Sequence, residues 1–235
     1  MLFAKQYSNI SFILSDYAKF IKKMISEASI EKYLRLAVED LYSRDGYLLS
    51  AEHELHEQTI THRLAIYLEQ HFSQNSFFKT QELSVDCEYN KNEDDCKRIY
   101  GPCMNCQNMC HIKKLNQPFD YNNRRYSTAA EFVRNYHEGK ICRSDIVVHH
   151  RGKNLPTNTL IVEVKKNSNN KDNAQTIDLI KLSAFTCKQA NCQYQYILGC
   201  YLKCEPNHAE IFIFGNGTIK KHIKFDALSK IWSSN

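Results

Sequence analysis

The sequence predicts an α/β fold, in which helices cover a sheet built from strands distant in the chain. Three observations lead to this prediction. Apolar residues recur at helical spacing up to about Phe72, two β-branched strands occupy Ser144 to Lys166, and a helix, a strand and a hairpin follow. Mixed helical and strand patterns of this kind indicate layered α/β architecture. At 235 residues, the chain suits one domain with an insertion, or one domain with a small appendage.

The charge, the apolar runs and the cysteine content of the chain limit the class of protein to which it is expected to belong. Lys and Arg total 31 against 26 Asp and Glu, a mild basic excess that permits a polyanionic partner without requiring one. No run of about 18 apolar residues occurs, so we expect no membrane span. The N-terminus lacks a basic region followed by an apolar core, which disfavours a secretory signal. Ten cysteines then indicate thiols or metal ligands in a reducing compartment, and we expect a cytoplasmic protein.

Residues 1–50 predict a helical N-terminal extension. One helix is expected from Ile10 to Ile25, and a second from about Ser29 to Tyr42, with Ser29 as its N-cap. The apolar stripe of the second helix consists of Ile30, Leu34, Ala37, Val38 and Leu41. Such stripes indicate packing, either as a helical cover for the sheet or as an arm that binds a partner.

A third helix is predicted from about Glu52 to Phe72, with Ile60, Leu64 and Leu68 as its core stripe. Glu57 lies seven residues before Leu64, so its side chain is expected on the inward side of the first turn. It is either a site residue or simply a favourable acid near a helix N-terminus.

The next segment, Leu83 to Asn90, alternates apolar and polar residues and predicts a strand. Leu83, Val85, Cys87 and Tyr89 are expected on one face. Asp86 and Glu88 are expected on the other, where they either extend an acidic site or form a solvated face.

Lys91 to Tyr126 is polar and predicts a Cys-rich insertion at about 91–126. Zinc binds four Cys or His ligands in tetrahedral geometry. The candidate ligands are Cys96, Cys103, Cys106 and Cys110, with His111 as a substitute. The alternative is a loop with free thiols, and a disulfide is disfavoured in a cytoplasmic protein. A short helix is expected after the insertion, over 127–136.

The stretch from Ser144 to Lys166 predicts two strands joined by a polar turn, with acids at a common end. Glu163 and Lys165 are two residues apart, so they share one face of the second strand. The midpoint of the turn predicts that paired residue numbers sum to about 309, which places Asp145 beside Glu163 and Lys165. Buried charges of this kind are costly when unpaired, and a divalent cation would offset that cost.

Beyond the hairpin, a helix is expected from about Ala174 to Lys188, and a strand from Tyr194 to Leu202. A C-terminal β-hairpin, Glu210 to Phe214 and Thr218 to Phe225, surrounds the turn sequence Gly215-Asn216-Gly217. After residue 52 the predicted order is helix, strand, insertion, strand, strand, helix, strand, hairpin.

Asp145, followed by Glu163-Val164-Lys165 and a helix, resembles the motif of the PD-(D/E)XK nuclease superfamily. Ser144 stands where that motif usually has a leading Pro. The resemblance covers about 52–202 without the insertion, and implies a restriction-endonuclease-like αβββαβ core within residues 51–235.

The resemblance implies a site for Mg²⁺ or Mn²⁺. Asp145 and Glu163 would hold the cation with the Val164 carbonyl, and Glu57, or Glu54 in its place, would join them. Lys165 would orient the attacking water and stabilise developing negative charge. On this view the substrate phosphates would contact Lys166, Gln175 and Lys181.

We therefore expect a metal-dependent nuclease that hydrolyses phosphodiester bonds, with DNA as the expected substrate. Many relatives dimerise to cut two strands, so the resemblance also allows a homodimer. Two alternatives stay open. One is a catalytically inactive nucleic-acid-binding module on the same fold, and the other is a zinc-stabilised protein-interaction module.

Overall fold

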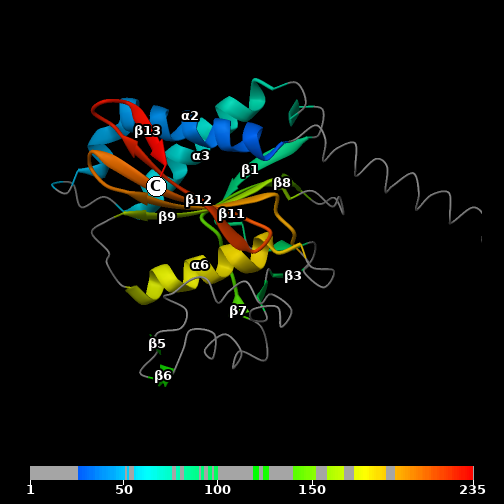
Figure 1. Ribbon diagram of the computed structural model, residues 1–235. Helices are drawn as coiled ribbons and strands as arrows, with labels where there is room; N and C mark the ends of the chain where they lie inside the picture. The colour runs from blue at the N-terminus through cyan, green and yellow to red at the C-terminus, as the bar shows by residue number, and fades with distance from the viewer. Residues whose placement is uncertain are drawn as a thin grey trace, which may run out of the picture.

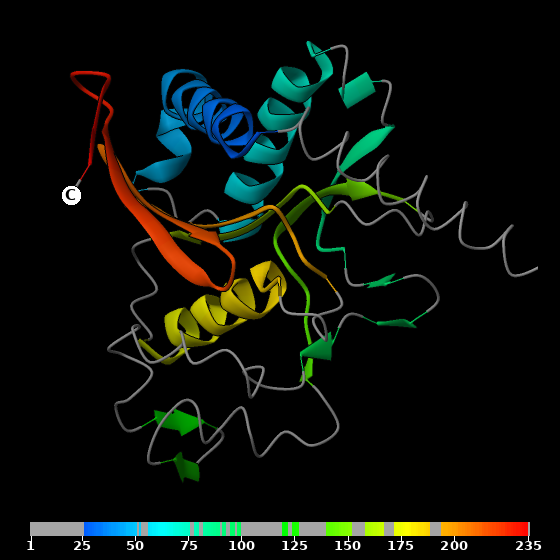
Figure 2. The same cartoon turned by 45° about the vertical axis from the view of Figure 1, so that its right-hand side comes forward.

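A computed structural model describes residues 26–50, 52, 56–75, 78–79, 82–89, 91–92, 95–96, 98–99, 119–121, 124–126, 140–151, 158–166, 172–188 and 194–234. A seven-stranded sheet forms the middle layer. Helices α2 (Glu27–Asp45) and α3 (Glu57–Ser73) cover one face, and α6 (Asp172–Thr186) covers the other (Figures 1 and 2). The short 3₁₀ helix η1 (Gly46–Leu49) follows α2. The predicted α/β class is confirmed at this level.

The strands follow one another across the sheet almost in chain order. They are β1 (Leu83–Cys87), β8 (Ile146–His150), β9 (Leu160–Lys166), β10 (Leu198–Cys204), β11 (His208–Gly215), β12 (Thr218–Asp226) and β13 (Ile231–Ser234). Neighbours are antiparallel except β9 and β10, which are parallel because α6 crosses the sheet between them. Apart from the short strands described next, the chain from α3 to β10 reads helix, three strands, helix, strand.

Short strands lie in the chain between β1 and β8, and all of them except β7 fall within the insertion predicted at about 91–126. They are β2 (Lys91–Asn92), β3 (Asp95–Cys96), β4 (Arg98–Ile99), β5 (Phe119–Tyr121), β6 (Arg124–Tyr126) and β7 (Lys140–Ile141). They form the pairs β2–β3, β4–β7 and β5–β6, separate from the seven-stranded sheet. The helices expected over 10–25 and 127–136 lie outside the described residues.

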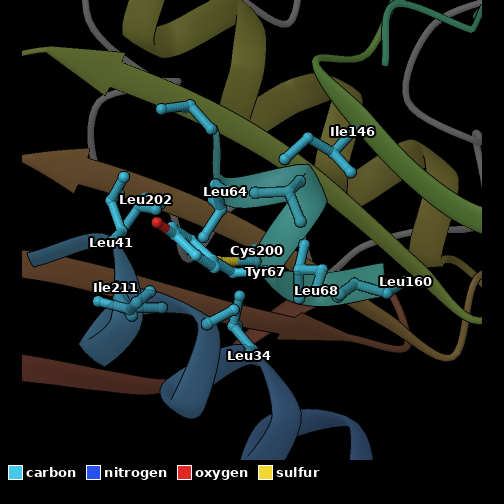
Figure 3. Close-up of a cluster of buried hydrophobic side chains, with 14 of the residues drawn as sticks. Leu34, Leu41, Leu64, Tyr67, Leu68, Ile146, Leu160, Cys200, Leu202 and Ile211 are labelled. Carbon is cyan, nitrogen blue, oxygen red and sulfur yellow. The ribbon is translucent and has the colours of Figure 1, made fainter. Parts of the chain in front are cut away.

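The larger core lies between the sheet and the helices α2 and α3. The predicted stripes supply it: Ile30 and Leu34 of α2 and Ile60, Leu64 and Leu68 of α3 are fully buried. Figure 3 shows these helices meeting apolar residues of β8 to β11. A second core on the opposite face packs α6 against the sheet, and its largest buried members are Phe185, Tyr194, Tyr196, Tyr201 and Phe214. Burial on both faces fixes which side of each strand faces which helix.

Helix boundaries differ from the predictions. The N-cap of α2 is Ser26, whose side chain accepts a hydrogen bond from the Ser29 amide, so the predicted N-cap at Ser29 is wrong. A serine three residues earlier satisfies the free N–H groups of the first turn equally well. Helix α3 begins at Glu57, five residues after the predicted Glu52, which makes Glu57 its first residue.

The strand predicted over 83–90 ends early. Glu88 has φ +51°, a left-handed conformation that breaks the alternation of faces. Leu83, Val85 and Cys87 pack toward the larger core, but Tyr89 packs with the α6 core. The prediction that Tyr89 shares their face is therefore wrong.

Both predicted hairpins are confirmed. The pairs of β8 with β9, such as Ile146 with Val162, sum to 308, one below the predicted 309. In the C-terminal hairpin, Asn216 and Gly217 have φ +52° and +77°, as the predicted tight turn requires. The edge strand β13 was not predicted.

Candidate functional site

The site lies where β9 continues past β8. The described β8–β9 ladder runs from Val148 opposite Leu160 to Ile146 opposite Val162. Asp145 lies one residue before β8. Its side chain, and not a backbone carbonyl, binds the next part of β9: Asp145 Oδ2 accepts a hydrogen bond of 2.6 Å from the Val164 amide. The backbone of β9 and the first acid of the motif are thereby held together.

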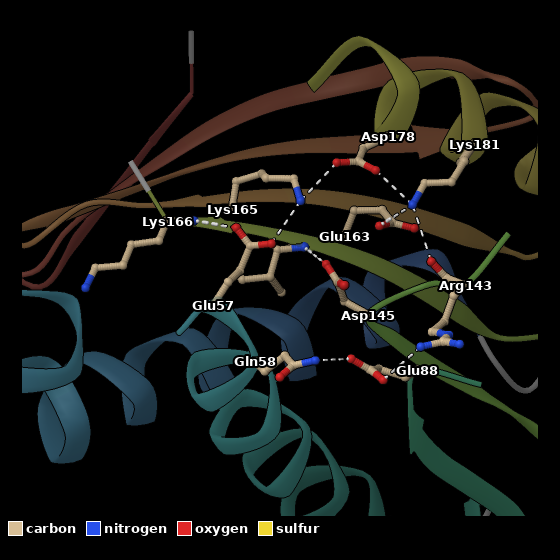
Figure 4. Close-up of polar contacts among 11 residues, drawn as sticks. Glu57, Gln58, Glu88, Arg143, Asp145, Glu163, Lys165, Lys166, Asp178 and Lys181 are labelled. Carbon is tan, nitrogen blue, oxygen red and sulfur yellow. Dashed lines mark hydrogen bonds and ion pairs between the residues drawn. The ribbon is translucent and has the colours of Figure 1, made fainter. Parts of the chain in front are cut away.

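Glu57 reaches this point from the first turn of α3. Its Oε1 lies 2.9 Å from Lys165 Nζ, and its Oε2 accepts a hydrogen bond of 3.2 Å from the Lys166 amide. The predicted inward orientation of Glu57 is confirmed. Figure 4 shows that Glu57, Asp145, Glu163 and Lys165, named from sequence alone, lie together.

Helix α6 adds two residues from the other side. Lys181 Nζ lies 2.7 Å from Glu163 Oε2 and 2.8 Å from Asp178 Oδ1. Asp178 Oδ2 in turn lies 3.2 Å from Lys165 Nζ. We call the six residues the β9 cluster: Glu57, Asp145, Glu163, Lys165, Asp178 and Lys181.

Asp178 was not among the predicted site residues, and Lys181 was predicted to contact a substrate phosphate. Lys181 is only 8% exposed and binds acids of the cluster, so its predicted role as a substrate-phosphate contact is wrong. A sequence clue existed: Asp178 and Lys181 lie one helical turn apart among apolar residues of α6, on the side that faces the sheet.

The cluster carries more acid than base. It contains four carboxylates and two ammonium groups. Glu163 is 1% exposed, and among the described residues its Oε1 has no hydrogen-bond partner. A buried, unsatisfied carboxylate oxygen is costly, so the arrangement favours a proton or a further cation there.

Burial raises the pKa of the Asp145 carboxyl to about 6, although the Val164 amide and the nearby lysines act in the opposite direction. Burial also raises the pKa of Glu163 well above its ordinary value, and the charges of Asp178 and Asp145 add to this effect against that of Lys181. Both acids are therefore held in a poorly solvated environment.

For the two lysines, the effect of neighbouring charges on the pKa exceeds the effect of burial. Burial disfavours the charge on Lys165, but Asp178 and Glu57 outweigh it and raise the pKa of Lys165. Burial likewise disfavours the charge on Lys181, but Glu163 and Asp178 outweigh it and raise the pKa of Lys181. Both side chains therefore remain ammonium ions at neutral pH.

A pocket of about 530 Å³ opens beside the cluster. Its walls are formed by Glu57, Gln58, Thr59, Thr61, His62, Arg63, Cys87, Glu88 and Asp145. Glu57 and Asp145 therefore face the pocket, and Lys181 and Asp178 lie on the side of α6. An ion or a phosphate in the pocket would meet Glu57 and Asp145, whereas the buried Glu163 does not line it.

The donor set fits a hard divalent cation, because Mg²⁺ favours carboxylate and backbone oxygens. Glu57, Asp145 and Glu163 would hold it beside the backbone of Val164. Within the described residues, however, no group of three or more His, Cys, Asp or Glu side chains is arranged to hold a metal as it stands. Lysine ammonium groups occupy positions between the carboxylates, as Figure 4 shows.

The other acids proposed for the site behave differently. Asp86 forms an ion pair with Arg151 and a hydrogen bond of 2.9 Å with His149 Nε2, so in this structure its partners lie outside the cluster, and the suggestion that it extends the acidic site stays a prediction. Glu88 lines the pocket and accepts a hydrogen bond of 2.7 Å from Gln58. Lys166 directs its Nζ to the Ser50 carbonyl at 3.2 Å, away from the cluster.

The predicted zinc ligands cannot be placed. Cys103, Cys106 and Cys110 lie outside the described residues, as do the substitute His111 and the side chain of Cys96. Glu54, the substitute for Glu57, also lies outside them. The zinc site stays a prediction.

Comparison with known proteins adds no relative. No family model matches the chain, and no curated protein or solved structure shows significant similarity to it. Over the described part of the chain, none of the helices combines the length and apolar character that crossing a membrane requires.

Proposed function

We propose that this chain is a metal-dependent nuclease of the PD-(D/E)XK type, with DNA as its expected substrate. The observation that carries the proposal is the meeting of Glu57, Asp145, Glu163 and Lys165 beside an open pocket. These residues come from three separate segments of the chain. A purely structural ion-pair network has no need of an excess of acids around a buried, unsatisfied carboxylate oxygen.

The order of elements supports the same proposal. Helix α3, the strands β1, β8 and β9, helix α6 and strand β10 follow the αβββαβ order of the superfamily that the motif resembles. Glu163 of that motif lies in the middle of β9, and Asp145, just before β8, accepts a hydrogen bond from the β9 backbone at Val164. Fold order alone does not establish an activity, so the site carries the argument.

In the proposed mechanism, Mg²⁺ or Mn²⁺ would be held by Asp145, Glu163, Glu57 and the Val164 carbonyl. A cation bound there would polarise a phosphate and lower the pKa of a water molecule. Because its pKa is raised, Lys165 stays charged and is unsuited to act as a general base at neutral pH. Its ammonium instead orients the attacking water and stabilises negative charge that develops on the phosphate.

The test is cleavage of single-stranded DNA, double-stranded DNA and RNA by the purified full chain with Mg²⁺, Mn²⁺ or EDTA. We expect cleavage that EDTA abolishes and that Glu163→Gln reduces at least about 100-fold. A matched control is Glu210→Gln, which changes an acid on β11 that pairs with Lys224 and not with the cluster. Equal cleavage by wild type and Glu163→Gln would contradict the proposal.

One observation favours a second candidate, a non-cleaving nucleic-acid-binding module. In this structure the ammonium groups of Lys165 and Lys181 already neutralise acids of the cluster. Binding of nucleic acid without cleavage, equally strong in wild type and Lys165→Ala, would favour this candidate. Its affinity should fall steeply as salt is raised, because phosphate contacts release counterions.

A further inference from the structure

The environment of Lys181 resembles a cation site built from oxygens. Its Nζ donates to Glu163 Oε2 at 2.7 Å and lies 2.8 Å from Asp178 Oδ1. A longer contact of 3.4 Å reaches the Arg143 carbonyl. An ammonium group has three donors, so these three oxygens match its full capacity.

This ammonium lies on the opposite side of the carboxylates from the pocket. Lys181 is 8% exposed and does not line the pocket, whereas Glu57 and Asp145 do. Glu163, which is 1% exposed, lies between the two sides: its Oε2 binds Lys181, and its Oε1 has no hydrogen-bond partner among the described residues. One carboxylate thus has one oxygen paired with a lysine and one oxygen unsatisfied.

We propose that Lys181 is a built-in counter-cation that competes with a divalent cation for Glu163, and that Asp178 is the positioning residue that keeps Lys181 and Lys165 in place. The inference rests on the proposed function, because it concerns the same carboxylates. It adds a lysine of the chain itself that competes with the metal for Glu163. It also gives two α6 residues, which lie outside the E-x-K motif, a role in controlling metal binding.

Asp178 is suited to this role because it contacts both lysines. Its Oδ2 lies 3.2 Å from Lys165 Nζ, and its Oδ1 lies 2.8 Å from Lys181 Nζ. If Glu57 and Glu163 bound a cation, the two lysines would lose these partners but could keep their contacts with Asp178. Asp178 is 5% exposed and does not line the pocket, so it acts through the lysines.

The two α6 residues therefore have opposite predicted effects on cation binding. Lys181→Met removes a positive charge beside the cation position and should lower the Kd for Mn²⁺ about tenfold or more. Asp178→Asn removes a negative charge from the cluster and frees Lys181 to rest on Glu163, and should raise that Kd. Asp178→Glu, which restores the charge, should recover much of the wild-type affinity.

The experiment is calorimetric titration of Mn²⁺ into the metal-free full chain, with no nucleic acid present. Lys188→Met is the matched control, since Lys188 follows α6 and, within the described part of the chain, its ion pair is with Glu27, at 3.6 Å and away from the cluster. Lys181→Gln provides a second test of charge removal if Lys181→Met folds poorly. A thermal melt of each variant, with and without Mn²⁺, reports folding independently of affinity.

For Lys181→Met we expect a lower melting temperature without Mn²⁺ and a larger upward shift with it than in wild type. For Asp178→Asn we expect a lower kcat for cleavage with a smaller change in KM, since Lys165 loses its support. A purely structural Asp178 would change the melting temperature without changing the Mn²⁺ affinity of the folded protein.

The outcomes separate this inference from the proposed function. Wild-type binding of Mn²⁺ with equal or weaker binding by both Lys181 variants would overturn the inference and leave the proposed function standing. Binding by the Lys181 variants and not by wild type would support the inference in its strongest form. Absence of binding in all of them would overturn both.

Discussion

Two clusters of charged residues in this protein are built on opposite principles. The helix cluster joins Asp45, at the end of α2, to Arg63 and Tyr67 of α3. Asp45 Oδ2 accepts from Arg63 at 2.6 Å and from the Tyr67 hydroxyl at 2.5 Å, and Arg63 also donates to that hydroxyl at 2.8 Å. One acid faces one base, and the three residues form a closed network.

The β9 cluster instead sets four carboxylates against two lysines and leaves Glu163 Oε1 without a partner in the described structure. The pKa values differ accordingly. Hydrogen bonds from Tyr67 and Arg63 outweigh the opposing effect of burial and lower the pKa of Asp45, whereas burial raises the pKa of Asp145 to about 6. The first cluster stabilises its acid as an ion, and the second destabilises it.

The difference in charge balance and pKa indicates that the helix cluster serves packing and that the β9 cluster serves ligand binding or chemistry. A charge network that serves packing is expected to satisfy its members in the folded chain alone. A network that serves chemistry often costs stability until its ligand arrives. The comparison therefore predicts that equivalent substitutions in the two clusters have unequal, and in one case opposite, consequences.

The largest expected difference concerns activity. Lys165→Met should reduce cleavage at least about 100-fold, because the ammonium that stabilises charge on the phosphate is lost. Asp45→Asn changes the acid of the helix cluster, which does not line the pocket, and should change cleavage by less than about threefold in the folded protein. Single-turnover assays with Mg²⁺ measure both. Equal losses would break the distinction between the clusters.

The next difference concerns the sign of a stability change. Asp45→Asn should lower the free energy of unfolding by about 1–2 kcal/mol, since a charged acceptor of two hydrogen bonds becomes neutral. Asp145→Asn should raise that free energy by about 1 kcal/mol in EDTA at pH 7, because a poorly solvated charge disappears and the side-chain oxygen can still accept from Val164. Urea denaturation measures both. A loss of stability in both variants would contradict the comparison.

The same acids predict opposite pH dependences. The pKa of Asp145 rises from 3.8 to about 6 on folding, so its favourable contribution is present below pH 3.8 and is lost as pH rises through about 6. The pKa of Asp45 is lowered from 3.8, so its contribution is present above pH 3.8 and is lost as pH falls through the lower folded value. These contributions should be visible in denaturation curves recorded in EDTA.

Relative to wild type, Asp145→Asn should remove part of the decline in stability between about pH 4 and pH 7. Asp45→Asn should instead flatten the loss of stability below about pH 4. Lys188→Met serves as the control, because Lys188 belongs to neither cluster. If the two asparagine variants altered the same part of the pH curve, the assignment of the shifts would be wrong.

Sequence patterns predicted most of what brings the β9 cluster together. The two-residue period of β9 places Glu163 and Lys165 on one face, and the turn arithmetic places Asp145 beside them. The helical period orients Glu57 correctly even though its helix starts five residues late. Local periodicity assigns each residue to one face of its helix or strand, and hairpin register aligns the strands. Together they predict contacts between residues more than a hundred positions apart in the sequence.

The remaining features depend on packing that periodicity does not encode. Asp178 and Lys181 join the cluster because of the way α6 packs on the sheet, which brings their side chains against Lys165 and Glu163 of β9. The left-handed Glu88 reverses the face of Tyr89, and no local pattern marks it. Strand β13 has four residues, too few to establish a period.

The smallest expected difference concerns salt. The side chain of Arg63 is 38% exposed, whereas the side chains of Lys181 and Glu163 are 10% and 1% exposed. Mobile ions screen exposed charges over about 10 Å at 0.1 M salt, but they cannot enter a buried pair. Double-mutant cycles should therefore give an Asp45–Arg63 coupling that falls by a few tenths of a kcal/mol between about 0.1 M and 1 M NaCl.

The Glu163–Lys181 coupling should stay constant over the same range of salt, within the error of a few tenths of a kcal/mol that such cycles carry. The cycles use Asp45→Asn with Arg63→Met, and Glu163→Gln with Lys181→Met, all in EDTA. A buried coupling that weakened with salt as much as the exposed one would mean that water and ions reach Lys181. The lysine would then behave as a solvent-exposed charge. The helix cluster and the β9 cluster would no longer differ in how well their ion pairs are shielded from water and salt.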